Sequence, residues 1–199
     1  MRKLAVILAM IFSTSAIYAQ NYSITPEESK ISVKGTSNVH DWELNAEEYS
    51  GEASITIEDN QLLSIEALKF SVIVNSMKSG KGGLDKKTYG ALKENKHSTI
   101  DFELTQVNQI NDNSVMATGD LTIAGVTNSI EMEVTFGILP DGAISFQGSK
   151  QLKMTDYNVS PPSAMFGAVK AADEIEVNFD ITFACSSCSD QVSNSGRSR

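Results

Sequence analysis

The sequence predicts an all-β protein: an antiparallel barrel or sandwich of about eight to ten strands with one short helix. Three observations lead to this fold class. Apolar and polar residues alternate in most segments, as they do on strands that have one dry face and one wet face. Turn signals separate these segments at short, regular intervals. The period changes to that of a helix in one place, around residues 84–93.

The clearest strands are the two arms of a hairpin over residues 114–137. A short connection at residues 124–128 separates the arms, and its Gly125 can adopt a positive φ. A single hairpin cannot shelter its own apolar face, so the rest of the chain must supply the other walls. The alternating apolar residues of the arms are Val115, Ala117, Leu121, Ile123, Ile130, Met132, Val134 and Phe136.

Five segments nearer the N-terminus show the same alternation and predict five further strands. The most β-prone of them contains Leu68, Phe70 and Val72. The pair Thr25-Pro26 marks a turn after the first strand, and residues 35–38 interrupt the pattern. The expected strands lie around residues 22–24, 31–34, 39–44, 53–57 and 68–74.

The helical period appears at residues 84–93. Leu84, Thr88 or Tyr89, and Leu92 are spaced as on one face of a helix, in spite of Gly90. The glycine-rich residues 79–83 predict a flexible loop in front of this segment. We expect a short amphipathic helix that lies across the mouth or the side of the sheet.

Strand patterns resume after the helix and continue to residue 183, with Asp141-Gly142 as a hairpin signal. The long segment 155–172 contains Pro161-Pro162 and the apolar pair Met165-Phe166, so we expect it to pack on the sheet as a lid. Closure into a barrel would remove the exposed strand edges, and about eight strands leave room for a small ligand. The expected strands outside the hairpin lie around residues 100–104, 144–146, 152–154 and 175–183.

The two ends of the chain differ from its middle. Residues 1–19 combine a basic start, an apolar run too short to span a membrane, and a small-residue end, which predicts a secretory signal peptide. We therefore divide the chain into a signal peptide at residues 1–19, a barrel domain at residues 20–184, and a disordered polar tail at residues 185–199. This division predicts a periplasmic or secreted protein without an integral membrane segment in its mature form.

The overall charge argues against one class of partner. The formal net charge is −9, and cleavage after Ala19 would remove two positive charges and no negative ones. Such a surface repels nucleic acid and anionic lipid head groups. We therefore expect no DNA or RNA partner.

Four stretches carry a resemblance to a known family. They are residues 31–42 (ISVKGTSNVHDW), 77–102, 119–127 (GDLTIAGVT) and 157–183. Together they span nearly the whole predicted mature chain. In this combination the sequence resembles the YceI-like family of exported bacterial proteins that bind lipids and polyisoprenoids. The resemblance implies a lipocalin-like antiparallel barrel that holds a long isoprenoid or fatty chain.

The resemblance favours a hydrophobic cavity over the alternative, a barrel whose apolar side chains fill a closed core. Which face of each strand points inward depends on register, because a shift of one residue inverts the set. The predicted lining is Trp42, Phe70, Leu84, Tyr89, Leu92, Ile100, Phe102, Leu121, Ile123, Val134, Phe136, Phe146 and Phe166.

Catalytic and metal sites find little support. His40 and Asp41 are adjacent on an expected strand and would point to opposite faces, and no nucleophile stands at a known spacing from a base. With His97, these residues are too few and too scattered for a metal site. We expect no catalytic residue, no metal and no cofactor.

Two further motifs have a plain reading and a functional one. The segment Gly80-Lys81-Gly82 lacks the upstream glycine and the βαβ setting of a phosphate-binding loop. We interpret four lysines as solvated surface residues: Lys78, Lys81, Lys86 and Lys87. The alternative is that they lie near a cavity mouth and bind a phosphate head group. Cys185 and Cys188 have redox-motif spacing without the strand-to-helix setting, so we expect a local disulfide.

These observations predict a protein that binds, sequesters or transports a long-chain polyisoprenoid or a similar amphipathic lipid. Two alternatives stay open. One is a ligand-free structural or interaction module, and the other is an enzyme that acts on such a lipid through His40, Asp41 or His97. An exposed barrel end would also suit a homodimer.

Overall fold

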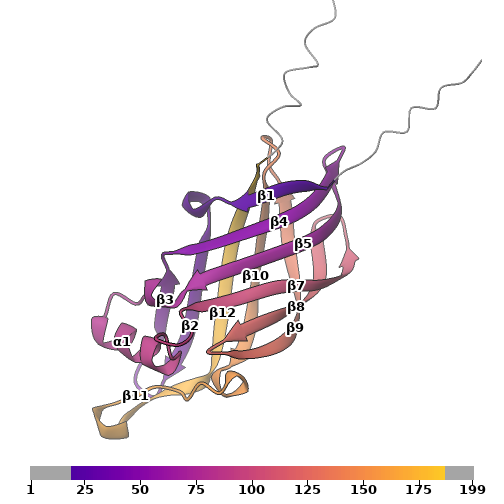
Figure 1. The fold of residues 1–199 in the computed structure, drawn as a ribbon. Helices are drawn as coiled ribbons and strands as arrows, with labels where there is room; N and C mark the ends of the chain where they lie inside the picture. Colours follow the sequence, from indigo (N-terminus) through magenta and orange to yellow (C-terminus); the bar gives the residue numbers. More distant parts are fainter. Residues whose placement is uncertain (1–18, 187–199) are drawn as a thin grey trace, which may run out of the picture.

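The alternating segments pair into one antiparallel sheet that closes on itself as an eight-stranded barrel (Figure 1). This computed structural model describes residues 19–186. Pairing between β1 and β12 closes the ring and places both ends of the described chain at the same end of the barrel. In spatial order the ring contains β1 (Gln20–Ile24), β4 (Tyr49–Glu58), β5 (Gln61–Ile73), β7 (Thr99–Ile110), β8 (Ser114–Ile123), β9 (Val126–Ile138), β10 (Ile144–Lys153) and β12 (Val169–Cys185).

The sheet divides at β12, which is 17 residues long. Its last residues pair with β1, and its residues 171–180 pair with β2 (Lys30–Ser37). From β2 the sheet continues through β3 (Trp42–Ala46) to β6 (Met77–Lys78). The second branch extends the wall at the end of the barrel away from β1.

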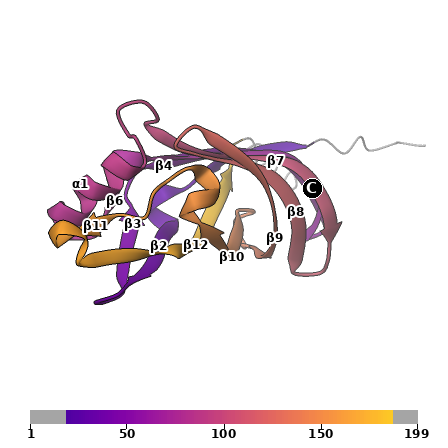
Figure 2. The ribbon, with the colours of Figure 1, turned by 90° about the horizontal axis from the view of Figure 1, so that it is seen from below.

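Short helical elements and one small strand surround this second end. The helix α1 (Gly82–Ala91) lies beside β11 (Ser163–Ala164) at the rim of the barrel (Figure 2). The Lys87 ammonium donates a hydrogen bond to the Ser163 carbonyl and joins the two elements. The remaining short elements are η1 (Pro26–Glu28), η2 (Val74–Ser76), η3 (Met154–Tyr157) and η4 (Met165–Gly167).

The predicted fold class and the hairpin are confirmed. The hairpin turn is only two residues long, and both Ala124 (φ 50°) and Gly125 (φ 83°) adopt the left-handed conformation that suits the twist of the flanking strands. The structure corrects several boundaries. Strand β2 continues to Ser37 through the expected interruption, and β3 begins at Trp42, so His40 and Asp41 lie before the strand that was expected at residues 39–44. The strands expected around residues 144–146 and 152–154 are one strand, β10, which ends at Lys153. Helix α1 begins and ends two residues earlier than predicted, and the expected lid segment contains η3, β11, η4 and the first residues of β12.

Predictions for the chain ends fall mostly outside the described residues. The predicted signal peptide lies there except for Ala19, and the predicted tail lies there except for Cys185 and Ser186. Cys188 is also outside, so the Cys185–Cys188 disulfide stays a prediction. Between residues 19 and 186 no helix has the length and apolar character needed to cross a membrane.

The interior is densely packed at the end of the barrel near β1. Ile55 and Ile144 are fully buried there, and Tyr22 and Phe183 are 2% exposed. The rings of Phe146 and Phe183 meet edge to face with their centroids 6.2 Å apart. This end of the barrel has the closed core that the sequence left open as an alternative, and Phe146 and Phe183 form its boundary with the cavity described below.

Candidate ligand-binding cavity

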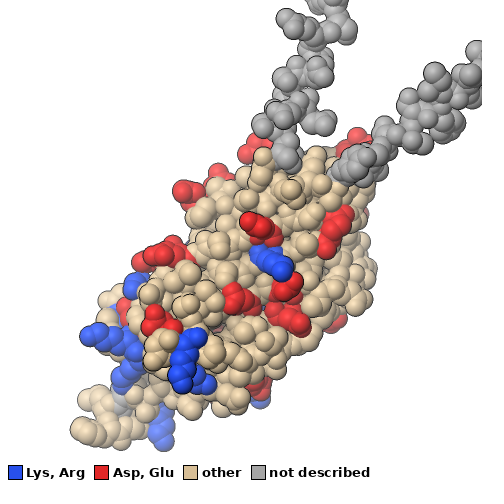
Figure 3. Space-filling model, viewed as in Figure 1, with Lys and Arg blue, Asp and Glu red and all other residues tan. Residues whose placement is uncertain are grey.

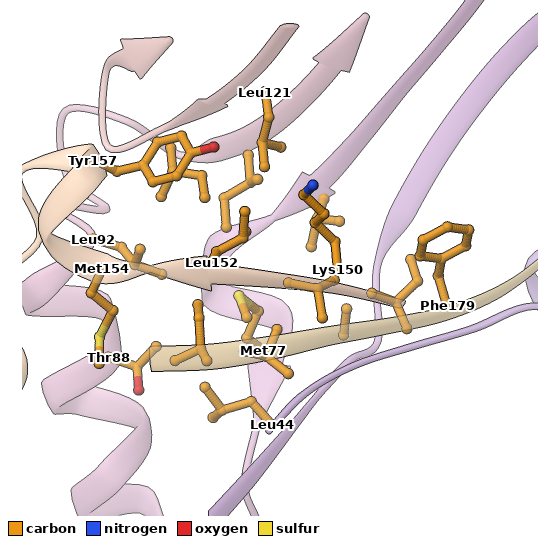
Figure 4. Close-up of a pocket in the computed structure, with 18 of the residues that line it drawn as sticks. Leu44, Met77, Thr88, Leu92, Leu121, Lys150, Leu152, Met154, Tyr157 and Phe179 are labelled. Atoms are coloured by element: carbon orange, nitrogen blue, oxygen red, sulfur yellow. The ribbon is translucent and has the colours of Figure 1, made fainter. Parts of the chain in front are cut away.

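The rest of the barrel interior is a cavity of about 760 Å³. This volume lies within the usual range of small-molecule sites. Inward-facing side chains from both branches of the sheet line it, together with α1 and the segment between β10 and β12 (Figure 4). Most of these side chains are aliphatic or aromatic, so the cavity suits a hydrocarbon chain.

Glycines on neighbouring strands keep aromatic side chains close to the wall. Gly35 lies directly opposite Trp42, and a Cβ added to Gly35 would come within 3.0 Å of the indole. The same would happen between a Cβ on Gly119 and the ring of Phe102, which is its diagonal neighbour. Because glycine has no side chain, these rings come closer to the neighbouring strand than any larger residue would allow.

Ten of the thirteen predicted residues line the cavity. Their side chains come from five strands of the ring, from β3, and from α1 and the residue after it. Whether they contact a ligand stays a prediction. The ten are Trp42, Phe70, Leu84, Leu92, Ile100, Phe102, Leu121, Ile123, Val134 and Phe146.

The other three lie elsewhere. The Tyr89 hydroxyl donates to the Met77 carbonyl at 2.9 Å and accepts from the Lys78 ammonium at 2.9 Å, which holds its ring towards β6. Phe136 packs beside Phe146 with ring centroids 6.4 Å apart, at the packed end of the barrel. Phe166 is wholly exposed on η4 with a φ of 54°, so it points away from the cavity.

Sequence reasoning missed about three quarters of the lining, including the whole contribution of β12. Ile175, Val177, Phe179, Ile181 and Phe183 all line the cavity, and their strict alternation was the available signal. The lining also contains one inward-facing lysine on β10, which period two places on the same face as Phe146 and Leu152. Further missed residues are Leu44, Met77, Thr88, Lys150, Leu152, Met154 and Tyr157, all labelled in Figure 4.

The mouth of the cavity lies at the end where α1, β11 and the β2–β3 turn meet. Lys81, Lys87 and His40 belong to the lining there. Lysine side chains gather around α1 at this end, whereas acidic side chains are spread over the visible barrel wall (Figure 3). Of the four lysines considered from the sequence, Lys81 and Lys87 therefore lie at the mouth.

The other two mouth-side lysines do not line the cavity. The Lys78 ammonium donates to the Asn75 carbonyl at 2.7 Å and to the Tyr89 hydroxyl. The bond to Tyr89 raises the pKa of Lys78. Lys86 is an exposed side chain on α1 outside the lining.

A carboxylate fixes the start of α1 beside this mouth. The Ser79 backbone N–H donates to Asp85 Oδ1 at 2.8 Å, and the Ser79 hydroxyl donates to the same oxygen at 2.5 Å. These bonds lower the pKa of Asp85, with the hydroxyl making the largest contribution. The ionised Asp85 therefore ties the loop before α1 to the helix, in place of an N-cap side chain, which Lys81 does not provide.

The residues considered for catalysis are dispersed. His40 lies at the cavity mouth and Asp41 is exposed beside it, whereas the His97 ring packs over Gly125 in the β8–β9 turn. Within residues 19–186, no three His, Cys, Asp or Glu side chains gather in a way that could hold a metal ion.

Comparison with known proteins places this geometry in a family. The model of the YceI-like domain matches residues 22–183. A UPF0312 protein of Ectopseudomonas mendocina (strain ymp) is 34% identical over 104 residues, which are 48% of this chain. The aligned part is 54% of that relative, so the chain spans about half the length of the curated relative that it matches.

Solved structures share the fold at low sequence identity. BcnA of Burkholderia cenocepacia is 19% identical with a TM-score of 0.65, over 80% of this chain and 98% of BcnA. A polyisoprenoid binding domain from Saccharophagus degradans is 14% identical with a TM-score of 0.63, over 82% and 98% of the two chains. A YCEI protein of Campylobacter jejuni is 20% identical with a TM-score of 0.58, over 92% and 97%.

Proposed function

The chain belongs to the YceI-like domain family, and from this premise we propose that it binds a long-chain isoprenoid or a similar amphipathic lipid inside its barrel. The observation that carries the proposal is the cavity of about 760 Å³ with its apolar lining. A structural neighbour described as a polyisoprenoid binding domain supports the same class of ligand. In this proposal the barrel shields the hydrocarbon chain of the lipid from water and catalyses no reaction.

The energetics of an apolar chain are adequate for this role. Each buried CH₂ group contributes roughly 0.8 kcal/mol, so several isoprene units can bind tightly with few polar contacts. The cavity is already formed between rigid strands, which lowers the ordering cost of binding. Affinity should therefore rise with chain length until the cavity is full.

Mass spectrometry of an organic extract of the purified protein tests the proposal. We expect a co-purifying lipid, or uptake of an added polyprenol by protein from which lipid has been removed. An extract without lipid, together with no uptake of polyprenol, would favour the alternative of a ligand-free structural or interaction module. Turnover of the bound lipid that disappears when both His40 and His97 are changed to Ala would instead favour an enzyme.

A pair of variants on β9 tests whether the cavity is the binding site. Val134 lines the cavity, whereas its neighbour Thr135 is an exposed residue on the outer face. Val134→Trp should fill part of the cavity and weaken polyprenol binding by at least about tenfold. The matched control Thr135→Trp should change affinity by less than about twofold. Equal effects of the two substitutions would contradict binding inside the barrel.

We also propose that the protein acts outside the cytoplasm after removal of residues 1–19. The proposal rests on the basic, apolar and small-residue segments in that order. The intact mass and the N-terminal residue of the protein purified from its native host provide the test. A mature protein that begins at Gln20 is expected, and a chain that retains Met1 would argue against export.

A further inference from the structure

The barrel wall has a split between β9 and β10. Their ladder covers residues 135–138 of β9 and 144–147 of β10. Beyond it, β10 stays paired with β12, and β9 stays paired with β8. A side pocket of about 620 Å³ lies at the split and shares Ile130, Lys150, Leu152, Lys153 and Tyr157 with the main cavity.

Lys150 and Asn128 are polar residues on the inner face at this split. On β10, Phe146 and Leu152 are buried on the face that period two assigns to Lys150. The Lys150 ammonium donates to the Glu131 carbonyl of β9 at 2.6 Å, which leaves two of its three protons for other acceptors. Asn128 pairs with the cavity residue Leu121, and its amide donates to the Asp156 carbonyl at 2.9 Å.

The Tyr157 hydroxyl lies in the same place and has no partner within the described chain. The residue is 3% exposed, and its hydroxyl oxygen is buried without a hydrogen bond. The hydroxyls of Tyr22, Tyr49 and Tyr89 all have partners. A buried polar group without a partner destabilises the folded protein, so an acceptor at this position would remove that penalty.

The protonation state of Tyr157 suits a donor. Burial raises the pKa of the phenol, and the nearby Asn128 amide offsets part of this effect without meeting hydrogen-bond geometry. The hydroxyl is therefore protonated at neutral pH. The Tyr157 hydroxyl and the Lys150 ammonium both project into the cavity (Figure 4) and both line the side pocket.

We propose that Tyr157 and Lys150 bind the anionic oxygen head group of the ligand, a phosphate or a carboxylate, at the split between β9 and β10. The inference rests on the proposed function, because it assumes that an apolar chain occupies the cavity. A lysine and a phenol supply charge-assisted and neutral hydrogen bonds to one anionic group. The lysines at the mouth, Lys81 and Lys87, are the competing position for such a group.

Calorimetric titration of the delipidated full-length protein with three ligands of equal chain length tests the site. The ligands are farnesyl phosphate, farnesoic acid and farnesol. At least one anionic ligand should bind about tenfold or more tightly than the alcohol, and comparison of the two identifies phosphate or carboxylate. Tyr157→Phe and Lys150→Met should each weaken the binding of that anionic ligand by about tenfold. Each should change the affinity for farnesol by less than about twofold.

Matched variants guard against indirect effects. Tyr22→Phe removes a buried hydroxyl that already has partners, and Lys69→Met removes an exposed lysine that pairs with Glu103 at 2.9 Å on the outer face. Neither should alter the ratio of anion affinity to alcohol affinity. Tyr157→Phe should leave the Tm of the unliganded protein unchanged or raise it, because an unpaired hydroxyl is lost. A clear fall in Tm would mean that the hydroxyl is already paired and would overturn the site.

Two outcomes separate this inference from the proposed function. Equal affinity for all three ligands would show that the site at the split is wrong and would leave lipid binding intact. The same conclusion would follow if Lys81→Met and Lys87→Met abolished the preference for the anionic ligand. In that case Tyr157→Phe and Lys150→Met would preserve the preference. If the wild-type protein binds none of the three ligands or longer polyprenols, the proposed function fails and the head-group site fails with it.

Discussion

At the residue scale, the width of the cavity depends on two glycines in its wall, Gly35 and Gly119. Trp42 and Phe102 reach the cavity wall and lie over Gly35 and Gly119. Any larger residue at these glycines would push an aromatic ring towards the middle of the barrel. The two glycines therefore help to decide whether the same apolar residues form a cavity or a closed core.

Gly119→Val should reduce both stability and lipid uptake. The new side chain would overlap the Phe102 ring, which must then move into the cavity at a cost of about 1–3 kcal/mol. Urea unfolding and polyprenol uptake measure the two effects. Gly90→Ala in α1 is the control, because a Cβ there would meet no atom within 4 Å, and it should be neutral or slightly stabilising. Unchanged uptake in Gly119→Val would contradict this role.

At the element scale, two local structures hold the cavity mouth and the wall in place. The bonds from Ser79 to Asp85 fix the beginning of α1. The left-handed residues Ala124 and Gly125 reverse the chain between β8 and β9. Both structures are local in sequence, so substitutions should affect stability more than they affect the composition of the cavity lining.

Asp85→Asn should destabilise the protein by about 1 kcal/mol at pH 7, because a charge-assisted bond from the Ser79 hydroxyl is weakened. The folded-state pKa of Asp85 is lowered below its ordinary value of 3.8. Its contribution is therefore complete above that value and is lost as the pH falls through the folded-state pKa. Urea unfolding of both proteins from pH 7 to pH 3 measures this. A difference that stays constant over this range would refute the assignment.

Substitutions in the β8–β9 turn should have opposite effects. Gly125→Ala should lower the free energy of unfolding by about 1–2 kcal/mol. Alanine is strained at the φ of 83° found here, and the new Cβ would overlap the His97 ring. Ala124→Asn should stabilise the protein by about 0.5 kcal/mol, because asparagine tolerates the left-handed conformation better than alanine. Thermal unfolding gives both values, and a stabilised Gly125→Ala protein would contradict the turn geometry.

At the scale of the whole molecule, the barrel has a packed end near β1 and a hollow end near α1. Ile55 is fully buried at the packed end, whereas Leu121 lines the cavity and is only partly buried. The free energy lost on truncation depends on how many neighbours a side chain has and on the cavity that it leaves. Equivalent truncations at the two ends should therefore differ in cost.

In the delipidated protein, Ile55→Ala should lower the free energy of unfolding by about 2–4 kcal/mol. Leu121→Ala should lower it by less than about 1.5 kcal/mol. Added ligand at 100 times its Kd should stabilise the wild-type protein by about 2.7 kcal/mol. Chemical denaturation with and without polyprenol measures all three quantities. Equal costs for the two truncations in the lipid-free protein would show that the interior near Leu121 is filled.

Much of this architecture could be predicted from local patterns. Period-two alternation identified the strands from residues 22 to 183, and the spacing of Leu84 and Leu92 identified α1. Ten of the thirteen predicted lining residues face the cavity for the same reason. Phe166 is the clearest failure, because it lies in no alternating segment and its exposure follows from the backbone turn at η4.

The sequence by itself determined which residues form strands and which side chains share a face, because alternation is a property of neighbouring residues. Only the tertiary structure decided that one end of the barrel is packed and the other hollow, and that β9 and β10 part around Lys150 and Tyr157. An inward side chain meets whatever the opposite wall presents. That distance depends on strand number, tilt and register between residues far apart in the chain.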